Sequence, residues 1–279
     1  MKQPATYLRV DGRPIRVSVR GEGPPLLMIM GLGGNIEMWD PLERALNARG
    51  VQTIVYDASG TGHSPARLVP QRMAGVARQA VHLLDALGYP VVDVLGVSFG
   101  GAVAQQLTLT NPHRVRRLVL ASTTCGIGGV PGNPLAMSLL ATPLRYYSPT
   151  FLRLTADVLY GPREGVDDGV RREQSAARHS RPPTAWGYVS QLVAVAGWSS
   201  LPWLHRIRSR TLVLAGDADP IVPPRNARIL ASRIPNAQLE TVQGAGHLLL
   251  MDRADLCASM IASFLQLPVP TDVSDRAGR

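Results

Sequence analysis

Short apolar runs alternate along this chain with longer stretches of helical periodicity, and this alternation constrains the fold more than any other feature. The predicted strands cover residues 6–10, 15–20, 26–30, 51–57, 91–97, 117–121, 211–215 and 238–242. The predicted helices cover residues 41–49, 72–87, 99–110, 225–234 and 253–267. Near-continuous apolar runs are typical of parallel strands that are buried on both faces. The pattern therefore predicts an α/β protein with a mostly parallel, eight-stranded sheet and helices on both faces.

The alternation is interrupted once, between Ala121 and Thr211. The intervening segment is punctuated by Gly and Pro, favours helix and carries many aromatic side chains. An insertion between two core strands, near the carboxyl edge of a sheet, is where a lid would sit. We expect an α/β core in two parts, residues 1–125 and 207–267, with a helical lid over 126–206 and a frayed tail at 268–279.

A predicted strand-to-helix junction holds the sequence GVSFGG at residues 96–101. In this setting the pattern G-x-S-x-G indicates a nucleophile elbow, a strained turn that exposes a serine hydroxyl. Glycine two residues before and after Ser98 avoids collisions with neighbouring backbone. The amino end of the following helix directs N–H groups toward developing negative charge. Ser98 is therefore the candidate nucleophile, with a chance Gly/Ser-rich helix start as the alternative.

A serine hydroxyl needs a base, and the base needs an orienting carboxylate. In the order Ser, acid, His, the chain offers Asp219 in the turn after the seventh predicted strand and His247 in the turn after the eighth. Both fall just past strand ends, on the same edge of the sheet as Ser98. Asp217 is a rival acid whose position better suits capping the loop or the next helix. Taken in isolation, Asp219 is better explained as an aspartate that initiates a turn, and His247 as a histidine in a loop. Together with Ser98 they predict a catalytic triad.

A glycine-rich loop, GLGG at residues 31–34, follows the third predicted strand. Glycine lets a backbone approach a reacting carbonyl closely. We assign the two donors of an oxyanion hole to the backbone N–H groups of Leu32 and Phe99. A dinucleotide or phosphate cradle is the alternative, but this loop lacks the G-x-G-x-x-G pattern that opens a helix.

The formal net charge is +9, yet we expect no nucleic-acid partner. Lys2 is the only lysine, and the arginines are scattered among acids instead of forming a basic helix with stacking aromatics. Two cysteines, Cys125 and Cys257, cannot form a disulfide framework and lack metal-ligand spacing, and the histidines lack it too. We therefore expect no metal, no cofactor and a reduced, cytoplasmic location.

The amino-terminal residues have no apolar signal core ahead of the first charges. Two stretches without formal charge, 118–144 and 182–204, are broken by Gly, Pro and Ser, so neither predicts a membrane-spanning helix. An apolar lid face flanked by arginine leaves open a peripheral contact with a lipid or polyester granule.

Ser98, Asp219 and His247, in this order, resemble the α/β-hydrolase superfamily over nearly the whole chain. A narrower match is to the intracellular depolymerases of medium-chain-length poly(3-hydroxyalkanoate). It rests on GLGGN at 31–35, GY at 187–188, GW at 197–198, WLH at 203–205, TLVLAGD at 211–217 and RIPNAQL at 233–239. The resemblance implies a serine ester hydrolase with those three residues as its triad, acting on aliphatic 3-hydroxyacyl polyesters or oligomers. Phe99 departs from the depolymerase pattern, which has tryptophan there.

Apolar contacts to an acyl substrate are assigned to Leu192, Val195 and Trp198 of the lid and to Leu248, next to the candidate histidine. Packing inside the lid is the alternative role for the first three. A general medium-chain carboxylesterase, lipase or thioesterase would use identical machinery. A dehalogenase or epoxide hydrolase needs a carboxylate at the elbow, so Ser98 argues against both. A non-catalytic binding module on this fold would show a broken triad.

Overall fold

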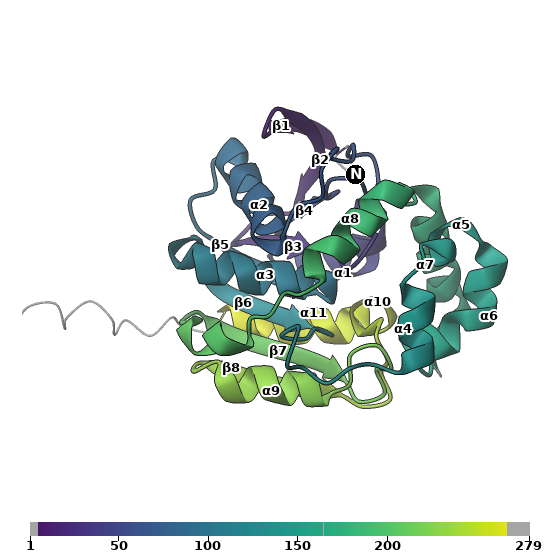
Figure 1. The fold of residues 1–279 in the computed structure, drawn as a ribbon. Coiled ribbons are helices and arrows are strands. Elements are labelled where there is room, and N and C mark those ends of the chain that lie inside the picture. Colours follow the sequence, from purple (N-terminus) through teal and green to yellow (C-terminus); the bar gives the residue numbers. More distant parts are fainter. Residues whose placement is uncertain (1–4, 164, 267–279) are drawn as a thin grey trace, which may run out of the picture.

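Eight strands form one sheet in the order β1-β2-β4-β3-β5-β6-β7-β8 (Figure 1). The computed structural model describes residues 5–163 and 165–266. The strands are β1 (Thr6–Val10), β2 (Arg13–Arg20), β3 (Pro25–Ile29), β4 (Gln52–Tyr56), β5 (Val92–Val97), β6 (Val115–Ala121), β7 (Arg210–Gly216) and β8 (Ala237–Val242). β2 is antiparallel to β1 and β4, and every other neighbouring pair is parallel. The predicted mostly parallel, eight-stranded sheet is confirmed.

Burial along the strands follows their place in the sheet. Every residue of the central β5 is buried, whereas the edge strands β1 and β8 are largely exposed. Strands covered on both faces need apolar side chains at nearly every position, and this is why the sequence predicts them. β2 begins two residues earlier than its apolar run because Arg13 pairs with Val10 across the turn. Asp11 and Gly12 of that turn both have positive φ, as a tight hairpin with right-handed strand twist requires.

Helices cover both faces of the sheet. They are α1 (Asp40–Asn47), α2 (Met73–Leu87), α3 (Phe99–Thr110), α9 (Arg225–Arg233), α10 (Leu249–Asp252) and α11 (Ala254–Gln266). α1 packs against α11, and α2 packs against α3, so the two pairs form layers on opposite faces (Figure 1). Within the described residues, no helix is long and apolar enough to cross a membrane.

The segment between β6 and β7, residues 122–209, is called the cap below. It holds α4 (Pro134–Leu140), α5 (Leu144–Tyr147), α6 (Pro149–Tyr160), α7 (Asp168–Ser180), α8 (Ala185–Val195) and the 3-10 helix η3 (Leu201–Arg206). Figure 1 shows α4–α7 grouped beyond one end of the sheet and α8 returning toward α2 and α3. Four cap helices begin where a side-chain oxygen accepts from the first-turn N–H groups, at Asn133, Ser148, Asp167 and Thr184. The predicted lid, 126–206, falls inside this segment, and the predicted frayed tail lies outside the described residues.

Candidate active site

Ser98 sits at the junction of β5 and α3 in a backbone conformation that side chains rarely adopt, with φ 54° and ψ −119°. Two glycines make the turn possible. A Cβ added to Gly100 would lie 2.0 Å from the carbonyl oxygen of Ile29, and one added to Gly96 would lie 2.3 Å from that of Gly100. Such strain persists only where the surrounding structure enforces it, and it projects the hydroxyl group away from the sheet.

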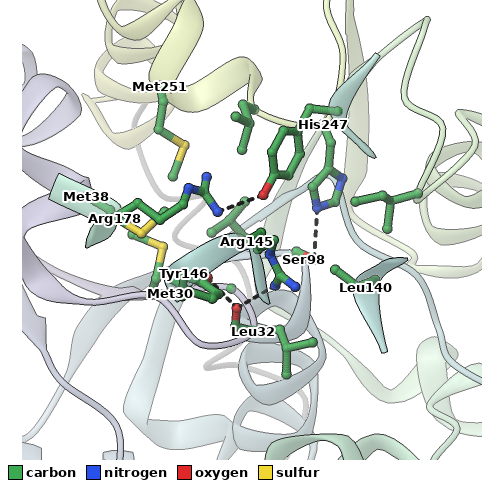
Figure 2. Close-up of a pocket in the computed structure, with 15 residues that line it drawn as sticks. Met30, Leu32, Met38, Ser98, Leu140, Arg145, Tyr146, Arg178, His247 and Met251 are labelled. Atoms are coloured by element: carbon green, nitrogen blue, oxygen red, sulfur yellow. Dashed lines mark hydrogen bonds between the residues drawn. The ribbon is translucent and has the colours of Figure 1, made fainter. Parts of the chain in front are cut away.

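Ser98, His247 and Asp219 are joined by hydrogen bonds. His247 Nε2 lies 3.1 Å from Ser98 Oγ, and His247 Nδ1 lies 2.7 Å from Asp219 Oδ2 (Figure 2 shows the first contact). Asp219 Oδ1 accepts from the backbone N–H groups of Ile221 and Val222, each at 2.9 Å, which fixes the carboxylate. With Nδ1–H directed to a carboxylate, Nε2 is the ring nitrogen that can take a proton from Ser98.

The cap also holds the histidine. The backbone N–H of His247 donates to the carbonyl oxygen of Tyr160, the last residue of α6, at 2.8 Å. Packing at this point is tight, because a Cβ added to Gly246 would lie 1.8 Å from the same oxygen. The position of the ring therefore depends on a core loop and a cap helix together.

Asp217, the rival acid, points elsewhere. Its Oδ1 accepts from the backbone N–H of Gly244 at 2.8 Å, and the residue is exposed. It therefore joins the loops after β7 and β8. The structure brings Asp219, and not Asp217, to the histidine ring.

The loop of the expected oxyanion hole lies against Ser98 and is fastened by the cap. The carbonyl oxygen of Leu32 accepts from Arg145 Nη2 at 3.1 Å and from the hydroxyl of Tyr146 at 2.6 Å. The next N–H, that of Gly33, donates to Gln191 Oε1 at 2.8 Å. The peptide group between Leu32 and Gly33 is thus held at both ends, which fixes the direction of the neighbouring Leu32 N–H. Arg145, Tyr146 and Gln191 carried no sequence motif.

A cavity with about 440 Å³ of empty space, counted out to its mouth, opens beside Ser98 (Figure 2). Core and cap both contribute to its wall. Its apolar lining includes Met30, Leu32, Met38, Leu140, Leu248 and Met251.

Of the four residues assigned to acyl contacts, Leu248 lines this cavity and the other three do not. Leu192 and Val195 are partly buried against the hydrophobic core. The indole N–H of Trp198 donates to Gln106 Oε1 on α3 at 2.9 Å, so this side chain ties the cap to the core. For these three, the contacts favour packing over substrate contact.

Arginine and tyrosine alternate along the cap side of the cavity. The Arg178 guanidinium lies 5.0 Å from the ring centre of Tyr160 and 5.3 Å from that of Tyr146. Arg145 lies 4.7 Å from the ring centre of Tyr146 and 5.2 Å from that of Tyr188. We call these five residues the arginine–tyrosine ladder. It joins α5, α6, α7 and α8 through cation–π contacts.

Burial raises the pKa of Tyr188 to about 12. Its phenol is therefore protonated at neutral pH, when it accepts from Arg145 Nη1 and donates to the carbonyl oxygen of Leu140. Tyr188 thus offers Arg145 a dipole and a ring face, but no negative charge. In the described part of the chain, no group of three or more His, Cys, Asp and Glu side chains is placed to hold a metal ion.

Comparison with known proteins agrees with this fold. Residues 24–254 match the model of a family described as alpha/beta hydrolase fold. The chain is 41% identical over 275 residues to a poly(3-hydroxyalkanoate) depolymerase of Ectopseudomonas oleovorans, covering 95% of this chain and 94% of the relative. An enol-lactonase structure from Burkholderia xenovorans LB400 superimposes with a TM-score of 0.78 at 26% identity, over 94% of this chain and 100% of that one. The chain belongs to the α/β-hydrolase fold family.

Proposed function

We propose that this protein is a serine hydrolase of carboxylic esters that acts through an acyl-enzyme on aliphatic 3-hydroxyacyl esters. The observation that carries the proposal is the hydrogen-bonded series from Asp219 through His247 to a serine on a strained strand-to-helix turn. The substrate class is supported by the 41% identity to a poly(3-hydroxyalkanoate) depolymerase and by the mainly aliphatic cavity lining.

The reaction proceeds in two acyl transfers. His247 takes the proton of Ser98 Oγ as that oxygen bonds to the ester carbonyl carbon. The N–H groups of Leu32 and Phe99 donate to the resulting oxyanion. The bond to the alcohol then breaks, and His247 delivers the proton to the departing oxygen. Water, activated by the same imidazole, releases the acid from Ser98.

A general medium-chain carboxylesterase, lipase or thioesterase remains the alternative within the same chemistry, and a binding module without turnover is the alternative of another class. Labelling with a fluorophosphonate probe separates the two classes. We expect one adduct, at Ser98, and none in Ser98→Ala. Ser232→Ala, an exposed serine on α9, is the matched control and keeps the adduct. An unlabelled wild-type chain would favour the binding module.

Substrate class is tested with the same variants. Aryl esters of increasing acyl length, the matching thioesters and a latex of poly(3-hydroxyoctanoate) are compared. We expect Ser98→Ala to lose on the order of 10⁴-fold or more in kcat on every ester. Release of 3-hydroxyoctanoate from latex supports depolymerase activity. Turnover of aryl esters alone points to a general esterase, and a preference for thioesters to a thioesterase.

A further inference from the structure

Two buried arginines line the cavity beside Ser98, and no carboxylate of the described residues pairs with either. Arg145 is 2% exposed and Arg178 is 4% exposed. Their polar contacts among the described residues are all to neutral oxygens: Thr142 O, Leu32 O and Tyr188 Oη for Arg145, and Tyr160 Oη for Arg178. Figure 2 shows both guanidinium groups in the same pocket as Ser98 and His247.

The two arginines differ in how fully their donors are used. Arg145 donates from both terminal nitrogens to three oxygens and holds the loop at Leu32, and only its buried Nε lacks a partner among the described residues. Arg178 uses one of its five N–H groups, at 2.7 Å to Tyr160. Its other N–H groups have no partner among the described residues, although the side chain lines the cavity. Arg178 is therefore the cation that is free to meet a ligand.

A buried cation without an anion is costly unless something in the site compensates for it. The tyrosine faces of the ladder supply part of that compensation. The tyrosine rings do not use the planar N–H donors of the Arg178 guanidinium. The spacing of these donors matches the two oxygens of a carboxylate. A carboxylate arriving with the substrate would complete the site.

We propose that the cavity contains a carboxylate subsite centred on Arg178, and that the preferred substrates are esters bearing a free carboxylate. This inference rests on the proposed function and narrows it. In a 3-hydroxyacyl oligomer the terminal unit carries such a group, separated from the last ester oxygen by the CH and CH₂ of its own backbone. The subsite therefore selects the carboxyl end of an oligomer, and the last ester bond is placed at Ser98.

The chemistry repeats along the oligomer. Ser98 Oγ bonds to the carbonyl carbon of the last ester, the carbon–oxygen bond to the terminal unit breaks, and the proton of Ser98 passes through His247 to the departing oxygen. One 3-hydroxy acid anion leaves. Water then cleaves the acyl-enzyme. Its hydroxyl group bonds to the acyl carbon, and its other proton passes through His247 to Ser98 Oγ. The shortened oligomer ends in a new carboxylate and is again a substrate.

The test compares two dimers of 3-hydroxyoctanoate, one with a free carboxylate and one with a terminal carboxamide of the same shape. Cleavage of the internal ester is followed by chromatography. We expect the ratio of kcat/KM, acid over amide, to be about tenfold to a hundredfold in the wild type. Arg178→Gln should bring that ratio close to one, and Arg178→Lys should retain part of it. Because both dimers are measured with the same variant, a general loss of activity, including loss from weakened cap packing, affects both kcat/KM values and leaves their ratio unchanged.

Arg172→Gln is the matched control, because it removes the same charge from an exposed position on α7. Its ratio should equal that of the wild type. A second measurement needs no variant: 3-hydroxyoctanoate should inhibit competitively at a lower concentration than 3-hydroxyoctanamide. A wild-type ratio near one, or a ratio unchanged in Arg178→Gln, overturns the subsite. In that outcome cleavage of the amide dimer and labelling of Ser98 still proceed, whereas failure of the proposed function abolishes both.

Discussion

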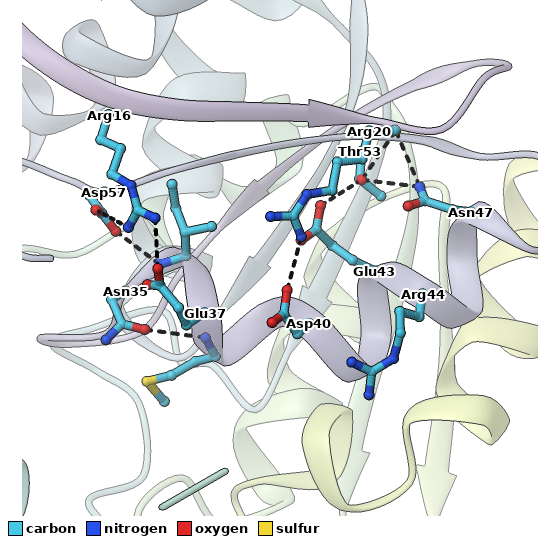
Figure 3. A network of polar contacts seen from close by, with 12 residues as sticks. Arg16, Arg20, Asn35, Glu37, Asp40, Glu43, Arg44, Asn47, Thr53 and Asp57 are labelled. Atoms are coloured by element: carbon cyan, nitrogen blue, oxygen red, sulfur yellow. Dashed lines mark hydrogen bonds and ion pairs between the residues drawn. The ribbon is translucent and has the colours of Figure 1, made fainter. Parts of the chain in front are cut away.

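Two arginine networks in this molecule are built in opposite ways. In the core, the arginines of β2 meet carboxylates: Arg16 lies 2.7 Å from Glu37, and Arg20 lies 2.9 Å from Asp40 and 2.7 Å from Glu43 (Figure 3). In the cap, the arginines of the ladder meet tyrosines and carbonyl oxygens. Where the protein supplies the anion, the arginine is part of the scaffold. Where it does not, a guanidinium with unused donors, as on Arg178, is available to a ligand.

The two networks act on the same loop from opposite ends. The core network reaches the 3-10 helix η1 (Ile36–Trp39), which follows the expected oxyanion loop. Asp57, held by Arg16, accepts from the N–H of Ile36 at 2.9 Å. The cap network holds the loop at Leu32 through Arg145. The residues of core and cap that hold this loop should therefore govern reaction rate, and Arg178, whose donors are mostly unused, should govern the choice of substrate.

After the loss of Ser98 itself, the largest effect expected is that of Asp219→Asn. Without the carboxylate, the imidazole of His247 loses its orientation and its correct tautomer, and kcat should fall by about 10³- to 10⁴-fold. The acid and amide dimers should be affected alike, since Asp219 contacts His247 and its substitution leaves Arg178 unchanged. The measurement is steady-state kinetics on both dimers. A loss of activity on the acid dimer alone would contradict the assignment of substrate choice to Arg178.

Gln191→Leu should lower kcat by about tenfold to a hundredfold on both dimers, because it leaves the buried N–H of Gly33 without its acceptor. The loop carrying the Leu32 N–H would then lose one of its fastenings. Gln106→Leu removes another hydrogen bond between cap and core, the one to Trp198, and serves as the control with kcat near the wild-type value. Equal kinetics for the two variants would show that Gln191 does not position the loop.

Glu43→Gln tests the core network. Glu43 is 1% exposed and accepts from Arg20 and from Thr53. Loss of its charge should reduce the free energy of unfolding by about 1–3 kcal/mol, measured by urea denaturation. The ratio between acid and amide dimers should stay unchanged. A shift of that ratio would mean that the scaffold arginines also take part in substrate choice.

The smallest effect expected is at the exposed ion pair between Arg44 of α1 and Glu173 of α7, at 2.9 Å. Arg44→Gln should change the free energy of unfolding by less than about 0.5 kcal/mol, because water and salt screen exposed charges. Urea denaturation at low and high salt checks this. A larger loss would show that this surface ion pair fastens the cap to the core.

The inner strands of the sheet could be predicted because they are buried on both faces and leave near-continuous apolar runs. The grouping of Ser98, Asp219 and His247 followed from the same regularity, since each lies just past the end of a predicted strand. The roles assigned to these three stay predictions until tested. Their closeness in space needed only the edge that parallel strands share.

The cap could not be predicted in this way. On α8, Val189 is 43% exposed and Val193 is 48% exposed, whereas Gln191 is 6% exposed. The buried face of that helix therefore carries a polar side chain, which apolar periodicity does not reveal. The ladder was missed for a related reason. Its members come from four helices, and no spacing in the sequence indicates that Arg178 lies over the ring of Tyr160.

The hydrogen bond from the His247 backbone to Tyr160 bears on the engineering of this protein. Exchanging the segment between β6 and β7 for that of a relative is an obvious route to a new specificity. Any such chimera also replaces Tyr160, whose carbonyl oxygen accepts from the His247 backbone N–H. The close packing between this carbonyl and Gly246 would change with it. A transplant that stops short of α6 would keep this support while replacing the helices before it.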